Sequence, residues 1–369
     1  MTRSITSKLA LFAVAAGFAM PAAAEMKFEN GSGGSVLLYG QFDPGYLSFD
    51  DGVTTTSELV DNTNSNSRVG LWVRQQYGEN LFTFNFETAL GFRPSAGLSQ
   101  NFTPKGVNWQ RTNIRKVDFA LKTPRYGTFS AGQGSMATDG AAEVDLSGTS
   151  LVTYVSIPDT SAAFQFRTSA GALSGKSIGG AFGDFDGGRL GRVRYDTPSF
   201  NGFTVSAAYG DNILATNVTF KTSDIALRYA GDAGDFKLKG AVGYKHVELA
   251  AGVTFNDTIG SFSVLHASGF NATIAAGNRS TNGDYGYGKL GYRANWFDIG
   301  ETALSVDYYR ANDRVSAGST STSYGFGAVQ KFDKYRVEAY LGYRTYQLTE
   351  TAASYQDASS VLFGARLKF

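Results

Sequence analysis

Residues 67–92 read SRVGLWVRQQYGENLFTFNFETALGF, and two runs of alternating side chains meet there at the turn 78–80. The first run places Val69, Leu71 and Val73 on one face and Arg68, Trp72 and Arg74 on the other. The second run alternates Phe82, Phe84 and Phe86 with Thr83, Asn85 and Glu87. A period of two predicts a β-hairpin with one apolar and one polar face. A barrel wall between lipid and a wet lumen needs this separation, because an arginine facing mid-bilayer lipid costs about 2–4 kcal/mol.

The same pattern continues along the chain and gives about sixteen strands. Short turns alternate with longer polar connections, as in outer-membrane barrels with periplasmic turns and external loops. The last strand, residues 359–369, is SSVLFGARLKF and ends on Phe369. We therefore expect an all-β, transmembrane antiparallel barrel that is closed, because an unpaired sheet edge has no water to bind in lipid.

The first 24 residues have the features of a signal peptide. Arg3 and Lys8 precede an apolar run from 9 to 20, and Ala22, Ala23 and Ala24 supply small residues for cleavage before Glu25. The sequence predicts an exported protein whose mature part, residues 25–369, is a single barrel domain.

Composition excludes several other classes of protein. The mature part has no apolar run of the length that a membrane helix needs, yet the chain contains 28 Phe and 20 Tyr, which suits aromatic girdles at both membrane interfaces. A net charge of +1 argues against nucleic-acid binding. Cysteine is absent, which excludes thiolate chemistry and cysteine-based metal sites.

One connection, residues 134–188, is several times longer than the others. An insertion of this length without its own strands is uncommon unless it is functional. It carries the acidic residues Asp139, Glu143, Asp145, Asp159, Asp184 and Asp186. We expect it to fold into the lumen and narrow it.

The segments LYGQFDPG (38–45), SRVGLWVRQQYGENL (67–81) and RVRYDTPSFNGFTVSAAYG (192–210), together with the terminal aromatic strand, resemble general porins of the Gram-negative outer membrane. The resemblance covers essentially the whole mature chain. It implies a sixteen-stranded barrel, a homotrimer, and a third external loop folded inward as a constriction. It also implies passive diffusion of small hydrophilic solutes and ions without an enzymatic step or cofactor, and contact with membrane lipid and lipopolysaccharide.

The predicted site is a constriction that is divided by charge. Its acidic side would be the inward loop, with Asp139, Glu143, Asp145 and Asp159. Its basic side would be wall residues at inward parity: Arg68, Arg74, Lys116, Arg192, Arg194, Arg344 and Arg366. A transverse field between them would filter solutes by charge, while the width limits their size. Arg115 has the parity of the lipid face, so we expect it near the interface or at a subunit contact.

Several alternatives remain open at this stage. Asp184 and Asp186 are calcium candidates, but one short acidic turn supplies fewer than the roughly six to eight oxygen ligands that calcium takes, so a solvated turn is favoured. The same barrel could be a selective channel for anions or sugars, or an adhesive barrel. A barrel hydrolase would need His246 or His266, and neither has an evident serine and acid beside it.

Overall fold

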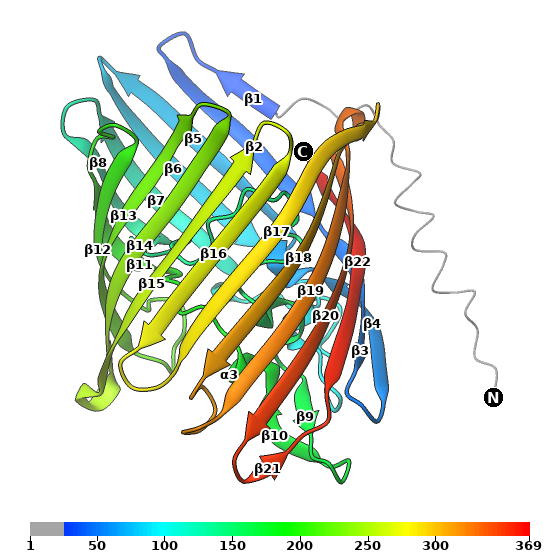
Figure 1. Ribbon diagram of the computed structural model, residues 1–369. Helices are drawn as coiled ribbons and strands as arrows, with labels where there is room; N and C mark the ends of the chain where they lie inside the picture. Colours follow the sequence, from blue (N-terminus) through cyan, green and yellow to red (C-terminus); the bar gives the residue numbers. More distant parts are fainter. Residues whose placement is uncertain (1–25) are drawn as a thin grey trace.

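The computed structural model describes residues 26–369, in which twenty strands form one antiparallel sheet that closes on itself (Figure 1). The predicted signal peptide, residues 1–24, lies outside the described residues. Two pairs of strands, β2 with β3 and β4 with β5, are the halves of single long strands, and β1 and β21 are short additions. Sixteen wall strands remain, as the sequence predicted.

The wall strands in chain order are β2 (Gly34–Phe42) with β3 (Pro44–Asp50), β4 (Thr55–Asp61) with β5 (Arg68–Tyr77), β6 (Asn80–Ala89), β7 (Ile114–Thr123), β8 (Gly127–Ser135), β11 (Arg189–Asp196), β12 (Phe203–Asp211), β13 (Phe220–Ala233), β14 (Phe236–Leu249), β15 (Thr254–His266), β16 (Phe270–Arg279), β17 (Asp284–Phe297), β18 (Gly300–Asn312), β19 (Thr320–Phe332), β20 (Val337–Glu350) and β22 (Ala358–Lys368). Each pairs with its neighbours in sequence. The barrel closes where β22 pairs with both β2 and β3.

The remaining elements are short. They are β1 (Met26–Glu29), β21 (Ala353–Ser354), the hairpin β9 (Gln165–Arg167) and β10 (Leu173–Ser177), the helices α2 (Pro158–Ser161) and α3 (Ile178–Ala181), and the 3-10 turns η1 (Thr63–Ser65), η2 (Ser95–Gly97), η3 (Arg111–Asn113), η4 (Ala250–Gly252) and η5 (Asp333–Tyr335). Among residues 26–369, no helix is long and apolar enough to cross a membrane.

Two details of the first strands differ from what the sequence pattern indicates. Pro44 and Gly45 indicate a bend or bulge, but the strand is interrupted at Asp43, between β2 and β3. The polar segment 50–66 has the composition of a loop, but it contains β4, which pairs with β3 along its whole length. Backbone pairing rather than hydrophobic burial holds this half-strand. Its polar sequence TTSELVD therefore does not show the apolar alternation by which a strand is recognised.

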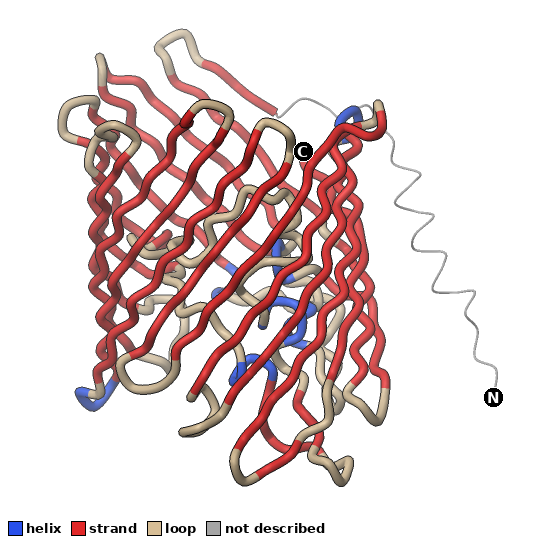
Figure 2. The backbone as a smooth tube through the Cα atoms, viewed as in Figure 1, coloured by secondary structure: helices blue, strands red, loops and turns tan. Residues whose placement is uncertain are grey.

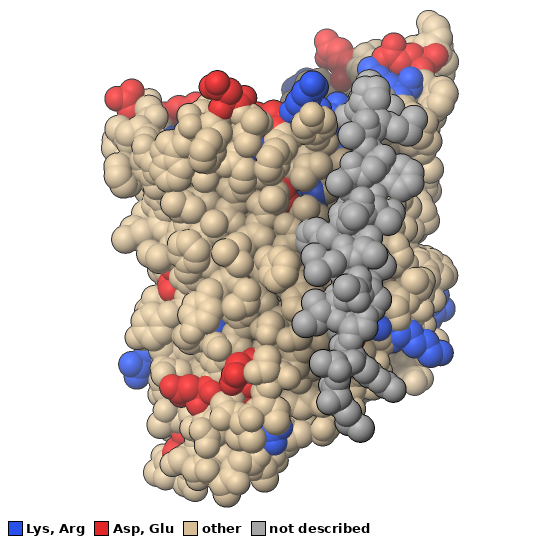
Figure 3. All heavy atoms as spheres, turned by 90° about the vertical axis from the view of Figure 1, so that its right-hand side faces the viewer, with Lys and Arg blue, Asp and Glu red and all other residues tan. Residues whose placement is uncertain are grey.

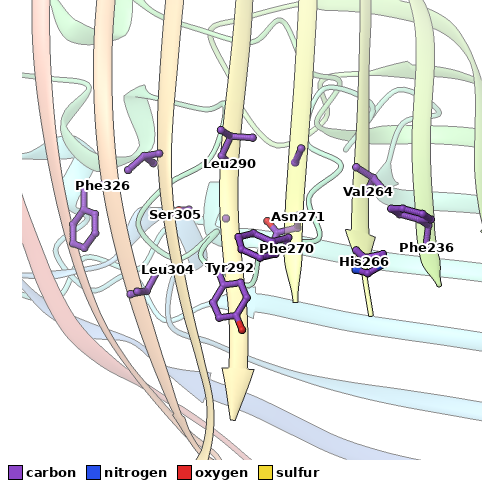
Figure 4. A pocket seen from close by; sticks show the side chains of 13 residues that line it. Phe236, Val264, His266, Phe270, Asn271, Leu290, Tyr292, Leu304, Ser305 and Phe326 are labelled. Carbon is purple, nitrogen blue, oxygen red and sulfur yellow. The ribbon is translucent and has the colours of Figure 1, made fainter. Parts of the chain in front are cut away.

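The outer face of the barrel is apolar. Val193, Ile225, Ile274 and Leu290 point outward and are more than half exposed. Figure 3 shows charged side chains mostly near the two ends of the barrel and a largely uncharged band between them on the face in view. Next to the short turns, Phe236, His266, Phe270 and Tyr292 border a shallow outer groove (Figure 4), as expected of an aromatic girdle.

The inner face is polar on one side of the barrel and covered on the other. The helices α2 and α3 and most of the long loop lie inside the ring of strands (Figure 2), while the hairpin β9–β10 of the loop lies at the rim beside β21 (Figure 1). Where the loop covers the wall, the inward positions are small. A Cβ on Gly342 would lie 2.7 Å from Cβ of Val152, and a Cβ on Gly327 would lie 2.6 Å from Oγ1 of Thr153. Small wall residues therefore make room for the loop.

Replacing Gly342 with alanine should displace the loop around Val152 and lower the free energy of unfolding by about 1–3 kcal/mol, because the added methyl overpacks a tight contact. Denaturant unfolding and limited proteolysis of residues 136–188 measure the two effects. Gly286→Ala is the matched control, since a Cβ there meets no atom within 4 Å. Equal stability and equal proteolysis of the two variants would contradict this role of Gly342.

Candidate functional site

The long loop, residues 136–188, connects β8 and β11, which pair directly with each other along β11. The loop is therefore not needed to join distant strands. Instead it runs across the inner wall from β13 to β20, reaches β3 and β4, and returns (Figure 1).

The first part of the loop is fixed by polar groups of the wall. The carboxylate of Asp224 accepts hydrogen bonds from the backbone N–H and hydroxyl of Thr138, at 2.7 and 2.6 Å. The hydroxyl of Ser261 donates to the carbonyl of Ala141 and accepts from the N–H of Val144. An irregular segment leaves backbone groups without partners of its own, so these side chains take their place.

The middle of the loop is fixed by a stack of two aromatic rings and by hydrogen bonds to the wall. The rings of Phe49 and Phe164 stack with centroids 4.0 Å apart, and both side chains are fully buried. The hydroxyl of Ser161 donates to Tyr346, and the side chain of Asn62 donates to the carbonyl of Leu151. These contacts attach the loop to the wall opposite its starting point.

The return segment is held by cations. Two guanidinium groups contact the ring of Phe185. The Cζ atom of Arg279 is 4.7 Å from the ring centroid, and the Cζ atom of Arg314 is 4.6 Å from it. Lys245 donates to the carbonyls of Phe185 and Asp186, both at 2.9 Å. Phe185 has a φ of 57°, a left-handed conformation that this non-glycine residue adopts with its ring held on both sides.

The four predicted acidic residues of the loop lie in different surroundings. Asp145 is buried in an ion pair with Lys289, at 2.7 Å, so it does not face open water. Asp139 is 3.9 Å from Arg189. The carboxylate of Asp159 accepts a hydrogen bond from the hydroxyl of Tyr154. The structure therefore corrects the prediction for Asp145, which anchors the loop.

Glu143 and Asp159 share an acidic cluster. Burial raises the pKa of Asp159 to about 7, and the charge of Asp184 adds to the rise, while Tyr154 and Arg115 oppose it. Burial and the neighbouring carboxylates also raise the pKa of Glu143 well above its ordinary value. The loop side of the lumen is thus only partly charged near neutral pH.

Three basic side chains of the wall gather around one carboxylate, Glu87. Nε of Arg115 donates to Oε1 of Glu87 at 2.6 Å, Nε of Arg68 is 3.6 Å from Oε2, and Lys116 is the cross-strand neighbour of Glu87. Glu87 is nearly buried, whereas Arg68 and Arg115 are each 22% exposed. The charge of Arg115 also acts on the carboxylate of Asp159 in the loop.

Arg115 is a correction to the sequence prediction, which placed it outward. In the β6–β7 ladder, Lys116 is opposite Glu87 and Ile114 is opposite Thr88, so Arg115 is an extra residue. Such a bulge turns the side chain of the extra residue and breaks the parity rule. Arg189, the first residue of β11, was also missed, because its direction is set by the adjoining loop rather than by strand alternation.

Other predicted wall residues are occupied elsewhere. Arg344 and Arg192 are buried in bidentate pairs with Asp307 and Asp118, which corrects the expectation that they line the lumen. Arg194 pairs with Asp196 and donates to two carbonyls of residues 135 and 136.

Two further wall predictions remain on the inner side. Arg366 pairs with Glu338 at 2.7 Å and also donates to Ser65, beside the wall cluster. Arg74 lies close to the turn 78–80, with its guanidinium 5.4 Å from the ring of Trp72, away from the loop.

The calcium candidates have other partners. Asp186 accepts hydrogen bonds from the N–H groups of Gly140 and Ala142, and Asp184 accepts from the N–H of Asp186. Within residues 26–369, no group of three or more His, Cys, Asp or Glu side chains could hold a metal ion. The hydrogen bonds give both carboxylates a structural role in the loop.

Neither histidine lies in the lumen. Nδ1 of His246 is 2.7 Å from the side-chain oxygen of Asn256, and Nδ1 of His266 is 2.7 Å from the hydroxyl of Ser268. His266 is part of the outer aromatic girdle (Figure 4). Both are placed at ends of strands.

A closed sixteen-stranded barrel with an apolar outer band and an internal loop defines a membrane channel. Comparison with known proteins agrees: the family model described as Gram-negative porin matches residues 10–351. The chain belongs to the Gram-negative porin family. It is an outer-membrane channel for passive diffusion. No curated protein matches the sequence.

Solved structures share the fold at low identity. An anion-selective porin from Comamonas acidovorans has a TM-score of 0.60 and 16% identity over 91% of this chain and 100% of its own. OmpT, an outer membrane protein of Vibrio cholerae, gives 0.56 and 16% over 94% and 100%. The OmpF of Salmonella typhi, in complex with daunomycin, gives 0.55 and 13% over 93% and 100%. These likenesses support the barrel architecture.

Replacing Lys289 with alanine should destabilise the protein by about 3–5 kcal/mol, because Asp145 is left buried without a counter-charge. The midpoint of heat denaturation, followed by circular dichroism, measures the loss. The double variant Lys289→Met with Asp145→Leu removes both charges and should recover most of it. A double variant as unstable as the single one would contradict the assignment of this pair.

Raising the pH should shift ion preference toward cations. A carboxyl group with a raised pKa becomes negative only as the pH passes that value, so Asp159 adds negative charge to the loop above about pH 7. Reversal potentials in a KCl gradient between about pH 5.5 and 8.5 measure the shift. Asp159→Asn should flatten the pH profile, and an unchanged profile in this variant would show that Asp159 does not face the permeating ions.

Proposed function

We propose that this porin is a general diffusion channel whose constriction favours anions. The observation that carries the proposal is the gathering of three cations around one nearly buried carboxylate: Glu87 forms ion pairs with Arg68 and Arg115, and Lys116 is its cross-strand neighbour. Arg366 and Arg189 also act electrostatically on Arg68, so positive charge gathers on this wall. The loop offers Asp139, Glu143 and Asp159, and the pKa of Asp159 is raised to about 7, so this group is neutral for part of the time near pH 7.

The field across the lumen follows from this placement. Base on the wall and acid on the loop produce a transverse field in a narrow aqueous section, where low-dielectric walls strengthen it. Small hydrophilic solutes pass without a chemical step, and the width of the section limits their size. The net excess of base makes anions the preferred ions.

We further propose a homotrimer in the outer membrane, with lipid and lipopolysaccharide around it. One of the similar solved structures, OmpT of Vibrio cholerae, is described as a trimer form. In this chain, β6–β8, β11 and β12 have eight to ten residues, whereas β13, β14, β17 and β20 have 14. The shorter wall suits contact with another subunit. Light scattering of the detergent-solubilised protein, with the detergent mass subtracted, tests this stoichiometry.

We also propose that the protein is not an enzyme. The sequence alternative, a hydrolase, needs a histidine with a nucleophile and an orienting acid. His266 has Ser268 and the ring of Phe236 beside it, and among the described residues no carboxylate hydrogen-bonds to it. Loss of a measurable esterase or lipase activity in His246→Ala or His266→Ala would overturn this part of the proposal.

Neutralising Arg68 and Lys116 together, as Arg68→Gln and Lys116→Gln, should move the reversal potential in a KCl gradient toward cation preference. Two positive charges are removed from the section where Glu87, Asp139 and Glu143 remain. Lys239→Gln is a control for charge removal on the inner face, because Lys239 lies on β14, which six strands separate from β5 and Arg68. Wild-type protein that forms channels without anion preference would reject the proposal.

A further inference from the structure

The bulge at Arg115 has a consequence for solutes that carry more than one charge. It directs two consecutive residues of β7, Arg115 and Lys116, into the lumen. Arg68 lies beside them on β5, which β6 separates from β7. Regular alternation would place one of any two adjacent residues against lipid. The bulge thus concentrates positive charge at one height of the wall, and bulges of this kind re-aim side chains at functional positions.

Both oxygens of the Glu87 carboxylate, which lies behind Arg68, Arg115 and Lys116, already accept hydrogen bonds. Oε1 of Glu87 accepts from Nε of Arg115 at 2.6 Å, and Oε2 accepts from the hydroxyl of Tyr39 at 2.9 Å. Glu87 is 7% exposed and lies deeper than the two guanidinium groups. It therefore orients the cations but does not cover the side that faces the lumen.

Several donors of the cluster are left for a solute. Nη1 of Arg68 and Nη1 of Arg115 make only long contacts of 3.3–3.4 Å, all to Asn66. Nη2 of Arg115 and Nζ of Lys116 have no hydrogen-bond acceptor or ion-pair partner in the part of the chain that the structure describes. Guanidinium groups bind oxyanions through paired N–H donors, and an ammonium adds a third point of contact.

We propose that Arg68, Arg115 and Lys116 form a subsite for a dianionic oxyanion such as phosphate, sulfate or a phosphate monoester. The inference rests on the proposed anion-preferring channel and adds that this class of solute binds at the constriction, so that its flux saturates. A monovalent anion meets the same field but cannot use the three donors at once. The carboxylates of Asp159 and Glu143 in the loop keep the binding weak enough for release, as conduction requires.

Planar-bilayer recordings in KCl at fixed ionic strength test the subsite with sulfate, which is dianionic over the whole working range of pH. Sulfate should reduce the chloride current with a saturating dependence on concentration, whereas nitrate should not. Arg115→Gln and Lys116→Gln should each weaken the apparent affinity for sulfate by about tenfold or more. Lys239→Gln, with the same loss of charge elsewhere on the inner face, should leave it unchanged.

The outcomes separate the two proposals. Anion preference in a salt gradient together with sulfate that behaves like nitrate would overturn the subsite and leave the anion-preferring channel in place. Equal effects of Arg115→Gln and Lys239→Gln on sulfate block would also overturn it. Channels without anion preference would reject the proposed function itself. Block by glucose 6-phosphate but not by glucose would extend the subsite to esterified phosphate, and block by inorganic phosphate alone would restrict it to the free ion.

Discussion

Within a bilayer no water is available to the backbone, so each strand of this barrel must find its hydrogen-bond partners in the strands on either side. The pairing of β22 with β2 and β3 satisfies this requirement by closing the sheet. Closure creates an outer surface that faces hydrocarbon and an inner surface that faces water. Strand alternation places apolar side chains on the first and polar side chains on the second. The internal loop is possible only because this wall is complete without it. Since β8 and β11 pair directly, residues 136–188 are free to serve the lumen alone.

A loop inside a barrel meets the same backbone problem in milder form. Its N–H and C=O groups need partners, and the wall supplies them through Asp224, Ser261 and Lys245. Its side chains need space, and Gly327 and Gly342 supply that. The loop thus packs on the inner face of the strands from β13 to β20. The open lumen is lined by the other strands, which carry Arg68, Arg115 and Lys116.

The alternation of residues 67–92 predicted the hairpin, the two faces and, by extension, the sixteen strands, because lipid imposes the same rule on each strand. The inward position of Arg68 and Lys116 followed from the same rule. The inward position of Arg115 could not be predicted, because one extra residue in a ladder reverses the parity and the amino-acid sequence gives no signal of it. β4 was missed for a related reason: pairing with β3 holds it, and its residues are mostly polar.

The sequence also could not tell which charges remain unpaired. Arg344 and Arg68 have equal parity and equal charge, yet Asp307 neutralises Arg344 under the loop while Arg68 shares Glu87 with Arg115. That outcome depends on the register of neighbouring strands and on where the loop lies. Glycine and serine at inward positions of the later strands would have indicated the path of the loop, because only small residues fit beneath it.

Pairing therefore decides the electrostatics of the lumen more than the number of charged residues does. A buried bidentate pair such as Arg192 with Asp118 has little field outside its own contact, since the opposite charges are adjacent. Two arginines that share one carboxylate, as Arg68 and Arg115 share Glu87, leave positive charge that is not cancelled at short range. The chain as a whole has a net charge of only +1, and the local surplus arises from one bulge in β7 that places a second base beside the first. A single inserted residue thus changes the charge of the lumen without changing the architecture of its wall.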